Sequence, residues 1–186
     1  MWIVLGVLIL MVVLGFGWYK NGYDKAIKYE QAAKKTWSDV DAVLQRRFDL
    51  IPNLVNTVKG YAAHETELFQ SLAQSREKYF QPGSGPAEKI QASNQLSGLL
   101  SRLLVLKETY PDLKANQNFL ALQDQLEGSE NRISVARTRY NAAVEMLNGY
   151  ERALIGSFFC DRAGVEPAEY FNATELAKGD APKVEF

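Results

Sequence analysis

Residues 2–18 read WIVLGVLILMVVLGFGW, and residues 1–19 contain no charged side chain. A helix needs about 17–25 mostly apolar residues to cross the roughly 30 Å hydrocarbon core of a bilayer. Trp2 lies at one end of the run, and Trp18 and Tyr19 lie at the other. Aromatic rings of this kind settle at the level of the lipid headgroups. The run therefore predicts a single transmembrane helix over residues 1–19.

A cleaved signal peptide and a soluble core helix are the alternatives for this run. A signal peptide carries basic residues before its apolar core and small residues at its cleavage site. No basic side chain precedes Trp2, and the run ends in Gly15-Phe16-Gly17-Trp18-Tyr19. A soluble core helix shows a polar face, which this run lacks. We therefore expect an uncleaved membrane anchor.

Charge after the run predicts the topology. Lysines follow it at positions 20, 25, 28, 34 and 35. Basic flanks favour the cytoplasmic side of a membrane, so we expect the N-terminus outside and the rest of the chain in the cytoplasm. The whole chain of 186 residues has a net charge of −1, which leaves no overall basic field for a nucleic-acid partner.

Two long stretches carry apolar side chains in steps of three and four. Such spacing places them on one face of a helix and is typical of bundles and coiled coils. The first series is Trp37, Val40, Leu44, Arg47, Ile51, Leu54, Val58, Tyr61, Glu65, Leu68 and Leu72. The second series is Phe119, Leu122, Leu126, Ser129, Ile133, Ala136, Tyr140, Ala143, Leu147, Tyr150 and Leu154.

These series predict three helices, with the first and third parallel and the second antiparallel between them. Pro52 should kink the first helix, because proline cannot donate a backbone hydrogen bond. Breaks are expected at the proline- and glycine-rich segment 81–86 and at Pro111. The expected elements are a helix over 23–80, a helix over 87–107, an extended or loose turn over 108–117, a helix over 118–154, and no regular periodicity after 156.

The predicted fold class is therefore all-α: a single N-terminal transmembrane helix followed by an elongated bundle of long antiparallel helices. We divide the chain into the transmembrane helix (1–19), the helical bundle (20–157) and a C-terminal tail (158–186). The aromatic residues of the tail are expected to pack partly on the bundle, and the segment Gly179–Lys183 is expected to be disordered.

Two blocks of residues resemble the LemA family of bacterial membrane-anchored helical proteins. They run from Trp37-Ser-Asp-Val40 through Leu44–Val55 to Val58–Glu65, and from Tyr110–Asn116 through Glu130–Ile133 to Tyr140-Asn141 and Asn148. The resemblance implies an antiparallel bundle behind one anchor in the bacterial cytoplasmic (inner) membrane. It implies no established enzymatic activity. The part of the chain after Leu154 departs from the family's pattern.

Few residues are suited to catalysis or metal binding. His64 and Glu65 resemble the start of a zinc-binding H-E-x-x-H helix, but position 68 is Leu and the chain has one histidine. We therefore expect no metal, no cofactor and no catalytic residues, with a hydrolase-like use of His64 as the alternative. Cys160, the single cysteine, lies beside aromatic residues, and we interpret it as an inert buried thiol.

The polar residues within the apolar series are more informative. Buried polar side chains that find partners can fix the register between helices. Alternatively, they could line a groove that receives another helix or a peptide. The structural or interaction candidates are Trp37, Arg47, Pro52, Glu65, Glu130, Arg137, Tyr140 and Asn141.

The predicted function is a membrane-anchored scaffold or adaptor that acts through protein–protein contacts and self-assembly. Its expected partners are the lipid bilayer, further copies of the chain and membrane-associated proteins. Gly6, Gly15 and Gly17 would allow close approach between spans, and Ile27, Trp37 and Val40 are expected to face water unless a neighbour covers them. The alternative is an enzyme or ligand-binding module that uses the polar residues, which would require a pocket.

Overall fold

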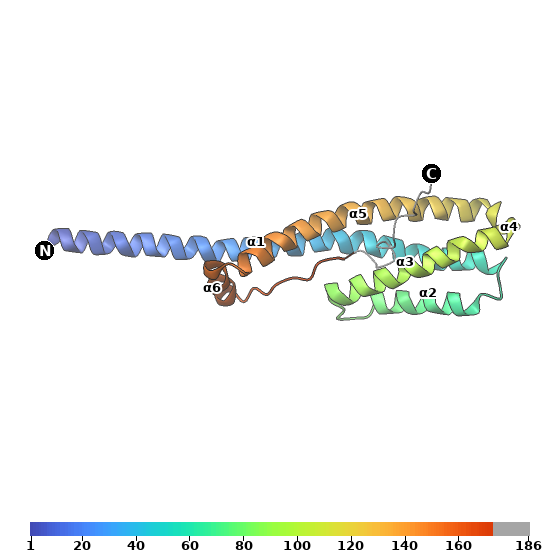
Figure 1. Cartoon of the computed structure of the whole chain (residues 1–186), viewed down its shortest axis with the longest axis horizontal. Helices are drawn as coiled ribbons and strands as arrows, with labels where there is room; N and C mark the ends of the chain where they lie inside the picture. Colours follow the sequence, from blue (N-terminus) through green and yellow to red (C-terminus); the bar gives the residue numbers. More distant parts are fainter. Residues whose placement is uncertain (173–186) are drawn as a thin grey trace, which may run out of the picture. The chain divides into compact units, whose positions relative to one another are not determined.

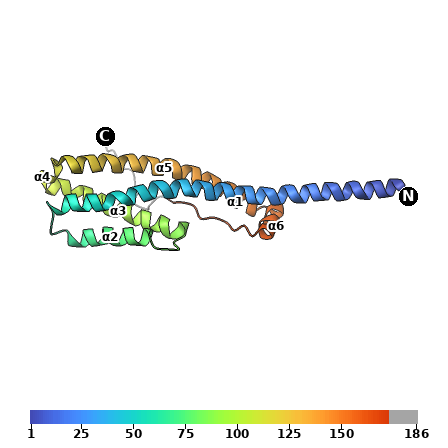
Figure 2. The same ribbon diagram turned by 180° about the vertical axis from the view of Figure 1, so that it is seen from behind.

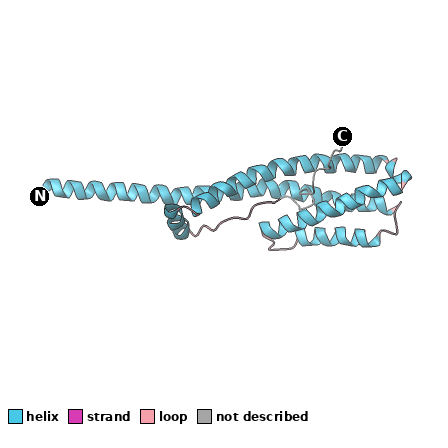
Figure 3. Ribbon diagram, in the orientation of Figure 1, coloured by secondary structure: helices cyan, strands magenta, loops and turns pink. Residues whose placement is uncertain are grey.

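The computed structural model describes residues 1–172, and this part of the chain forms helices without a strand (Figures 1 and 3). The all-α prediction is confirmed. The helices are α1 (Trp2–Lys59), α2 (Thr66–Tyr79), α3 (Pro86–Thr109), α4 (Pro111–Lys114), α5 (Gln117–Glu151) and α6 (Leu154–Ala163). The chain divides into two compact units. The first unit contains Met1–Ser38 and Thr138–Tyr170, and the second contains Asp39–Arg137 and, of the described residues, 171–172.

Helix α1 begins with the apolar run and continues without interruption to Lys59. Its most apolar 18-residue window has a mean hydropathy of 2.3, and none of that window is buried by the rest of the chain. The run is thus a helix that is long and apolar enough to cross a membrane, as predicted. Pro52 lies inside α1 and is exposed, and the helix continues past it for seven residues to Lys59.

The prediction of one helix from 23 to 80 is wrong at its C-terminal end. Helix α1 ends at Lys59, and Gly60–Glu65 form turns before α2 begins at Thr66. Glycine is a poor helix former, and a glycine after a basic last turn is a common stop signal. Glu65 therefore lies in the connection, where it immediately precedes α2, and it does not occupy a core position of the first helix.

This additional reversal changes the order of helix directions in the second unit. Helices α2 and α3 pack side by side as a hairpin, and α5 then runs antiparallel to α1 (Figures 1 and 2). The prediction that the first and last long helices are parallel is therefore wrong. Their buried faces agree with the prediction, because the residues of both series from Val40 to Val58 and from Phe119 to Leu147 are buried.

The link between α3 and α5 also differs from the prediction. Residues 111–114 form the short helix α4 where an extended or loose turn was expected. Asn116 then caps α5, because its Oδ1 accepts a hydrogen bond from the backbone N–H of Phe119 over 2.9 Å. Leu113 is fully buried, so α4 closes this end of the second unit with an apolar side chain.

The core of the first unit is built from small residues and one large ring. Its buried members are Ala26, Ala33, Ala143, Leu147, Phe159, Cys160 and Val165. Helix α6 was not predicted, because this region has no regular periodicity, and it contributes Phe159 and Cys160. It ends at Ala163 and is followed by Gly164, whose φ of +65° suits glycine. The predicted disorder at Gly179–Lys183 lies outside the described residues.

The expectation that Ile27, Trp37 and Val40 face water is wrong. Val40 is buried, and Ile27 and Trp37 are half-buried by the chain's own side chains. The ring of Trp37 lies 5.3 Å from that of Tyr140 on α5, measured between centroids. Tyr140 of α5 therefore supplies part of the cover of Trp37.

Candidate interaction site at a buried arginine

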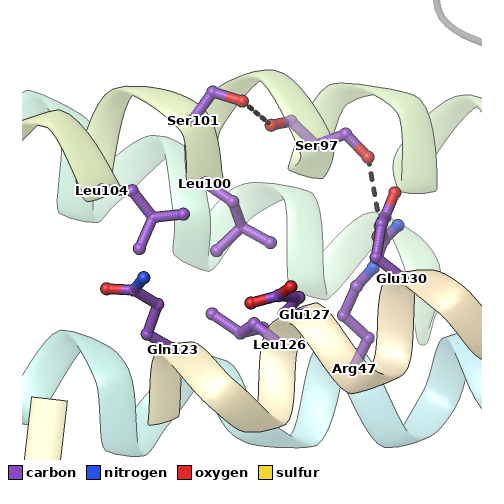
Figure 4. Close-up of a pocket in the computed structure, with 9 residues that line it drawn as sticks. All are labelled: Arg47, Ser97, Leu100, Ser101, Leu104, Gln123, Leu126, Glu127 and Glu130. Carbon is purple, nitrogen blue, oxygen red and sulfur yellow. Dashed lines mark hydrogen bonds and ion pairs between the residues drawn. The ribbon is translucent and has the colours of Figure 1, made fainter. Parts of the chain in front are cut away.

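Arg47 is a cation inside the second unit, with 1 % of its surface exposed. Its Nη1 donates to Glu130 Oε2 on α5 over 2.8 Å and to Ser97 Oγ on α3 over 3.1 Å. Its Nη2 donates to the backbone oxygen and the hydroxyl of Ser93. Arg47 thereby joins three helices, as Figure 4 shows for Ser97 and Glu130. Two of the predicted polar candidates, Arg47 and Glu130, are thus in direct contact.

The local sequence explains this arrangement. Arg47 lies three residues after Leu44 and four before Ile51, both buried, so its side chain must enter the core. Helix α3 offers Ser93, Ser97 and Ser101 at four-residue spacing, which places three hydroxyls on one face. Sequence reasoning missed these serines, although their spacing was a readable signal.

Burial and the ion pair shift the pKa of Arg47 in opposite directions. Desolvation lowers the pKa of the guanidinium, while the Glu130 carboxylate raises it. An arginine stays protonated in proteins, so the site keeps a buried positive charge beside a carboxylate that is 59 % exposed. At this site, the Nε of Arg47 and the Oε1 of Gln123 are buried and have no hydrogen-bond partner among the described residues. The polar layer is therefore not fully satisfied.

A cleft of about 340 Å³ lies beside the ion pair. In Figure 4, Leu100 and Leu104 of α3 point toward Gln123 and Leu126 of α5 across it. Glu127 and Glu130 add carboxylates at the α5 side. The remaining lining residues are Arg47, Ser97 and Ser101. The volume falls at the low end of the range for ligand pockets, roughly 300–1,000 Å³.

The other predicted residues do not gather at this cleft. Tyr140 belongs to the first unit, where its hydroxyl donates to the backbone oxygen of Glu169 over 2.9 Å. Asn141 is half-buried and has an interaction partner. Arg137 is half-buried, and Pro52 is exposed on α1.

A second polar cluster in the same unit was not predicted. The hydroxyl of Tyr79 donates to Asp41 Oδ1 over 2.6 Å, and Lys89 Nζ lies 2.8 Å from both carboxylate oxygens of Asp41. The ring of Tyr79 stacks on Phe48 with centroids 4.2 Å apart. Burial, followed by the hydrogen bond to Asp41, raises the pKa of Tyr79. The cluster joins α1, α2 and α3.

The residues considered for catalysis lie apart from the cleft lining. His64 is exposed in the turn after α1. Cys160 is a fully buried free thiol in the first unit, and burial raises its pKa, which disfavours the reactive thiolate. Within residues 1–172, no group of three or more His, Cys, Asp or Glu side chains is placed to hold a metal ion.

Comparison with known proteins places these features in a family. The chain is 23 % identical over 185 residues to magnetosome protein MamQ 1 of Paramagnetospirillum magneticum, which covers 86 % of this chain and 67 % of the relative. It is 24 % identical over 179 residues to magnetosome protein MamQ of Magnetospirillum gryphiswaldense, covering 83 % and 65 %. It is 19 % identical over 172 residues to protein LemA of Metamycoplasma hominis, covering 92 % and 78 %.

The chain thus spans about two thirds of the length of the MamQ proteins. The apolar start of α1 and these relatives together fit a membrane-associated protein. The family model described as LemA family matches residues 36–186, which include all of α2–α6. This match covers more than half of the chain, and the chain belongs to the LemA family.

Proposed function

We propose that this chain is a membrane-anchored adaptor of the bacterial cytoplasmic membrane that acts through protein–protein contacts. The observation that carries the proposal is the open cleft beside Arg47 and Glu130, in a chain that also supplies its own membrane helix. The proposal contains no catalytic step and no cofactor.

The cleft suits one segment of a partner protein. Leu100, Leu104 and Leu126 offer an apolar floor, and Glu127 and Glu130 offer negative charge at its α5 side. A segment that carries one apolar side chain and a neighbouring Lys or Arg would match both features. Helical segments bind such grooves through a few apolar anchors, and complementary charge sets the orientation.

The ion pair makes the cleft a preformed site. Arg47 holds α3 through Ser93 and Ser97 and holds α5 through Glu130. The two helices that line the cleft are therefore tied to α1, which limits the cost of ordering the site when a partner binds.

Self-association is the second part of the proposal, and it concerns the span. A Cβ added at Gly6, Gly15 or Gly17 would meet no other atom within 4 Å, so these positions are open to a neighbouring helix. The lysines after Tyr19 support the topology with the N-terminus outside and the bundle in the cytoplasm.

A ligand-binding module is the second candidate. Arg47 and Gln123 both line the cleft, and each has a polar atom without a partner among the described residues. A small polar molecule could satisfy part of this unused hydrogen-bonding capacity.

Site-specific photocrosslinking in native membranes separates the candidates. A photoreactive residue at Glu127, which lines the cleft, should give a discrete crosslinked protein species. The same residue at Gln125, exposed two positions away on the opposite face of α5, should not. Leu104→Lys should abolish the species, whereas Val105→Lys, outside the cleft lining and 64 % exposed, should preserve it.

Each other outcome has a definite meaning. Equal crosslinking at Glu127 and Gln125, or none at either position, contradicts the adaptor proposal. An unchanged protein band whose crosslinked peptide carries a small-molecule mass supports the ligand-binding candidate.

A further inference from the structure

We propose that α6 is a second membrane-contacting element, which lies in the headgroup region of the bilayer with its outer apolar face against lipid. The juxtaposition that carries this inference is the packing of Phe159, on α6, against Trp18 and Tyr19 at the end of the apolar run. It rests on α1 crossing the bilayer and is independent of the partner cleft.

The position of α6 is fixed by contacts within the first unit. The ring centroid of Phe159 lies 5.2 Å from that of Trp18 and 5.6 Å from that of Tyr19, both in edge-to-face geometry. The ring also lies on the backbone of Gly22, where an added Cβ would overlap it. Phe159 is 1 % exposed, so α6 is docked at this place by a buried anchor.

The aromatic end of the span defines the depth at which α6 lies. Trp and Tyr at the end of a transmembrane helix sit at the headgroup level. A helix whose ring packs edge-to-face on Trp18 and Tyr19 is therefore held at the same level when α1 spans the bilayer. Tyr150 reinforces the placement, because its hydroxyl donates to the backbone oxygen of Gly22 over 2.9 Å.

The outer face of α6 is apolar and largely exposed. Leu154 is 92 % exposed, Ile155 54 % and Phe158 45 %. At 100° per residue these three fall on one side of the helix, opposite Gly156, Phe159 and Cys160, which are buried. An amphipathic helix in the plane of an interface buries such a face about 5–10 Å into the boundary with the acyl chains.

Charges around this face fit the headgroup region. Arg162 lies with its guanidinium carbon 5.8 Å from the ring centroid of Phe158, and Arg152 is exposed just before α6. Lys20 follows the span directly. Asp161 and Glu151 also lie here, so the local charge is mixed and lipid contact would depend mainly on the apolar side chains.

Lipid is the occupant that the structure favours over a protein partner. Phe158 packs on Phe159, with ring centroids 5.3 Å apart, and Phe159 packs on Trp18 and Tyr19 at the end of the apolar run. The exposed apolar side of α6 therefore adjoins the aromatic end of the span. Contact with lipid would also remove the Leu154 side chain from water, where its exposure costs free energy.

A depth measurement on the full chain tests this inference. Single cysteines at Leu154 and Phe158 are labelled with an environment-sensitive fluorophore in proteoliposomes of phosphatidylcholine and phosphatidylglycerol. The unsubstituted chain serves as the labelling blank because Cys160 is fully buried. Met146, an exposed apolar residue of α5 in the same unit, is the matched control, and Leu10 within the span is the reference for lipid.

We expect blue-shifted emission at Leu154 and Phe158, with strong quenching by lipids that carry a nitroxide near the headgroup and weak quenching by aqueous iodide. A probe at Met146 should show emission without the blue shift, weak quenching by the nitroxide lipids and strong quenching by iodide. Iodide quenching at Leu154 and Phe158 equal to that at Met146 overturns the proposal. Blue-shifted emission that neither quencher affects also overturns it, because protein would then cover the face. A probe at Leu10 that remains in water overturns the membrane anchor itself.

Discussion

Arg47 Nη1 lies 2.8 Å from Glu130 Oε2, although the arginine side chain is 1 % exposed and the glutamate side chain is 59 % exposed. The two partners therefore depend on the pair to different degrees. Without Arg47, the Glu130 carboxylate can be hydrated. Without Glu130, the Arg47 cation stays in the core with only neutral partners, which is the costly case for a buried pair.

We expect Glu130→Leu to destabilise the protein by about 2–3 kcal/mol, and Arg47→Leu to cost less, about 1–2 kcal/mol. In the Arg47→Leu background, Glu130→Leu should be close to neutral. Chemical unfolding of the single and double variants measures this coupling. Glu127→Leu, which removes an exposed carboxylate from the same helix, is the control. Additive effects of the two substitutions in the double variant would show that the exposed carboxylate is not what stabilises the cation.

Substitution by alanine should have opposite effects on stability at Gly22 and at Gly149. An added Cβ at Gly22 would overlap the ring of Phe159, whereas at Gly149 it would meet no atom within 4 Å. Alanine in an open helical position stabilises by up to about 1 kcal/mol relative to glycine. We therefore expect Gly149→Ala to raise the melting temperature and Gly22→Ala to lower it.

Limited proteolysis adds a local readout for these variants. Displacement of Phe159 should make the segment after Glu151 more susceptible to cleavage in Gly22→Ala than in Gly149→Ala. A stabilising effect of Gly22→Ala would mean that Phe159 does not rest on α1.

Tyr79 predicts a loss of stability at high pH. Its pKa is raised above its ordinary value of 10.0, because the phenol is buried and donates to Asp41. The unfolded chain therefore releases this proton at a lower pH than the folded chain. The stabilisation is complete below about pH 10 and falls above it by up to about 1.4 kcal/mol per pH unit for one proton.

Replacement of Tyr79 should make the free energy of unfolding depend less strongly on pH. The free energy of unfolding of Tyr79→Phe, measured with denaturant between pH 8 and 11, should fall less steeply with pH than that of the parent. The difference in slope should correspond to the release of up to one proton. The remaining slope has contributors in Tyr140 and Cys160, whose pKa values burial also raises. Phe80→Leu, which disturbs the neighbouring ring without removing an ionisable group, should keep the parental slope. An unchanged slope in Tyr79→Phe would show that this phenol is hydrated when folded.

The buried faces of the long helices could be predicted because regular spacing determines which side chains share a face. The series on α5 is buried from Phe119 to Leu147 as expected. The break after Lys59 was missed for the same reason. Leu68 and Leu72 happen to continue the spacing across the turn, so the apolar pattern outweighed Gly60, the one local signal of a helix end.

The site was predicted in part. Arg47 and Glu130 were identified because they are charged residues within or beside apolar series. Ser93 and Ser97 were missed, since their role depends on α3 facing α1, and that arrangement follows from the unpredicted reversal at Gly60. The cleft likewise requires α3 and α5 to diverge, a tertiary property that helical spacing does not contain.

The span predicts self-association through one face. Gly6 and Gly17 are eleven residues apart, which places them within about 20° on a helix, whereas Gly15 lies on the opposite side. If Gly6 and Gly17 form the contact, Gly6→Leu with Gly17→Leu should lower the native mass of the complex in nanodiscs and mild detergent, and Gly15→Leu should leave it unchanged. A monomeric parent under all these conditions contradicts self-assembly, and an effect of Gly15→Leu alone moves the contact to the other face.

Topology is the remaining prediction, and it is tested with Trp2, at the outer end of the apolar run, and Gln125, in the bundle. Lysines at 20, 25, 28, 34 and 35 should hold the bundle in the cytoplasm. A membrane-impermeant maleimide added to spheroplasts should label Trp2→Cys, whose parent residue is 83 % exposed, and should not label Gln125→Cys until the membrane is opened. Buried Cys160 should stay unlabelled in both variants under native conditions. Labelling of Gln125→Cys in sealed spheroplasts with protection of Trp2→Cys would establish the opposite orientation, and the partners of the cleft would then have to be sought outside the cytoplasm.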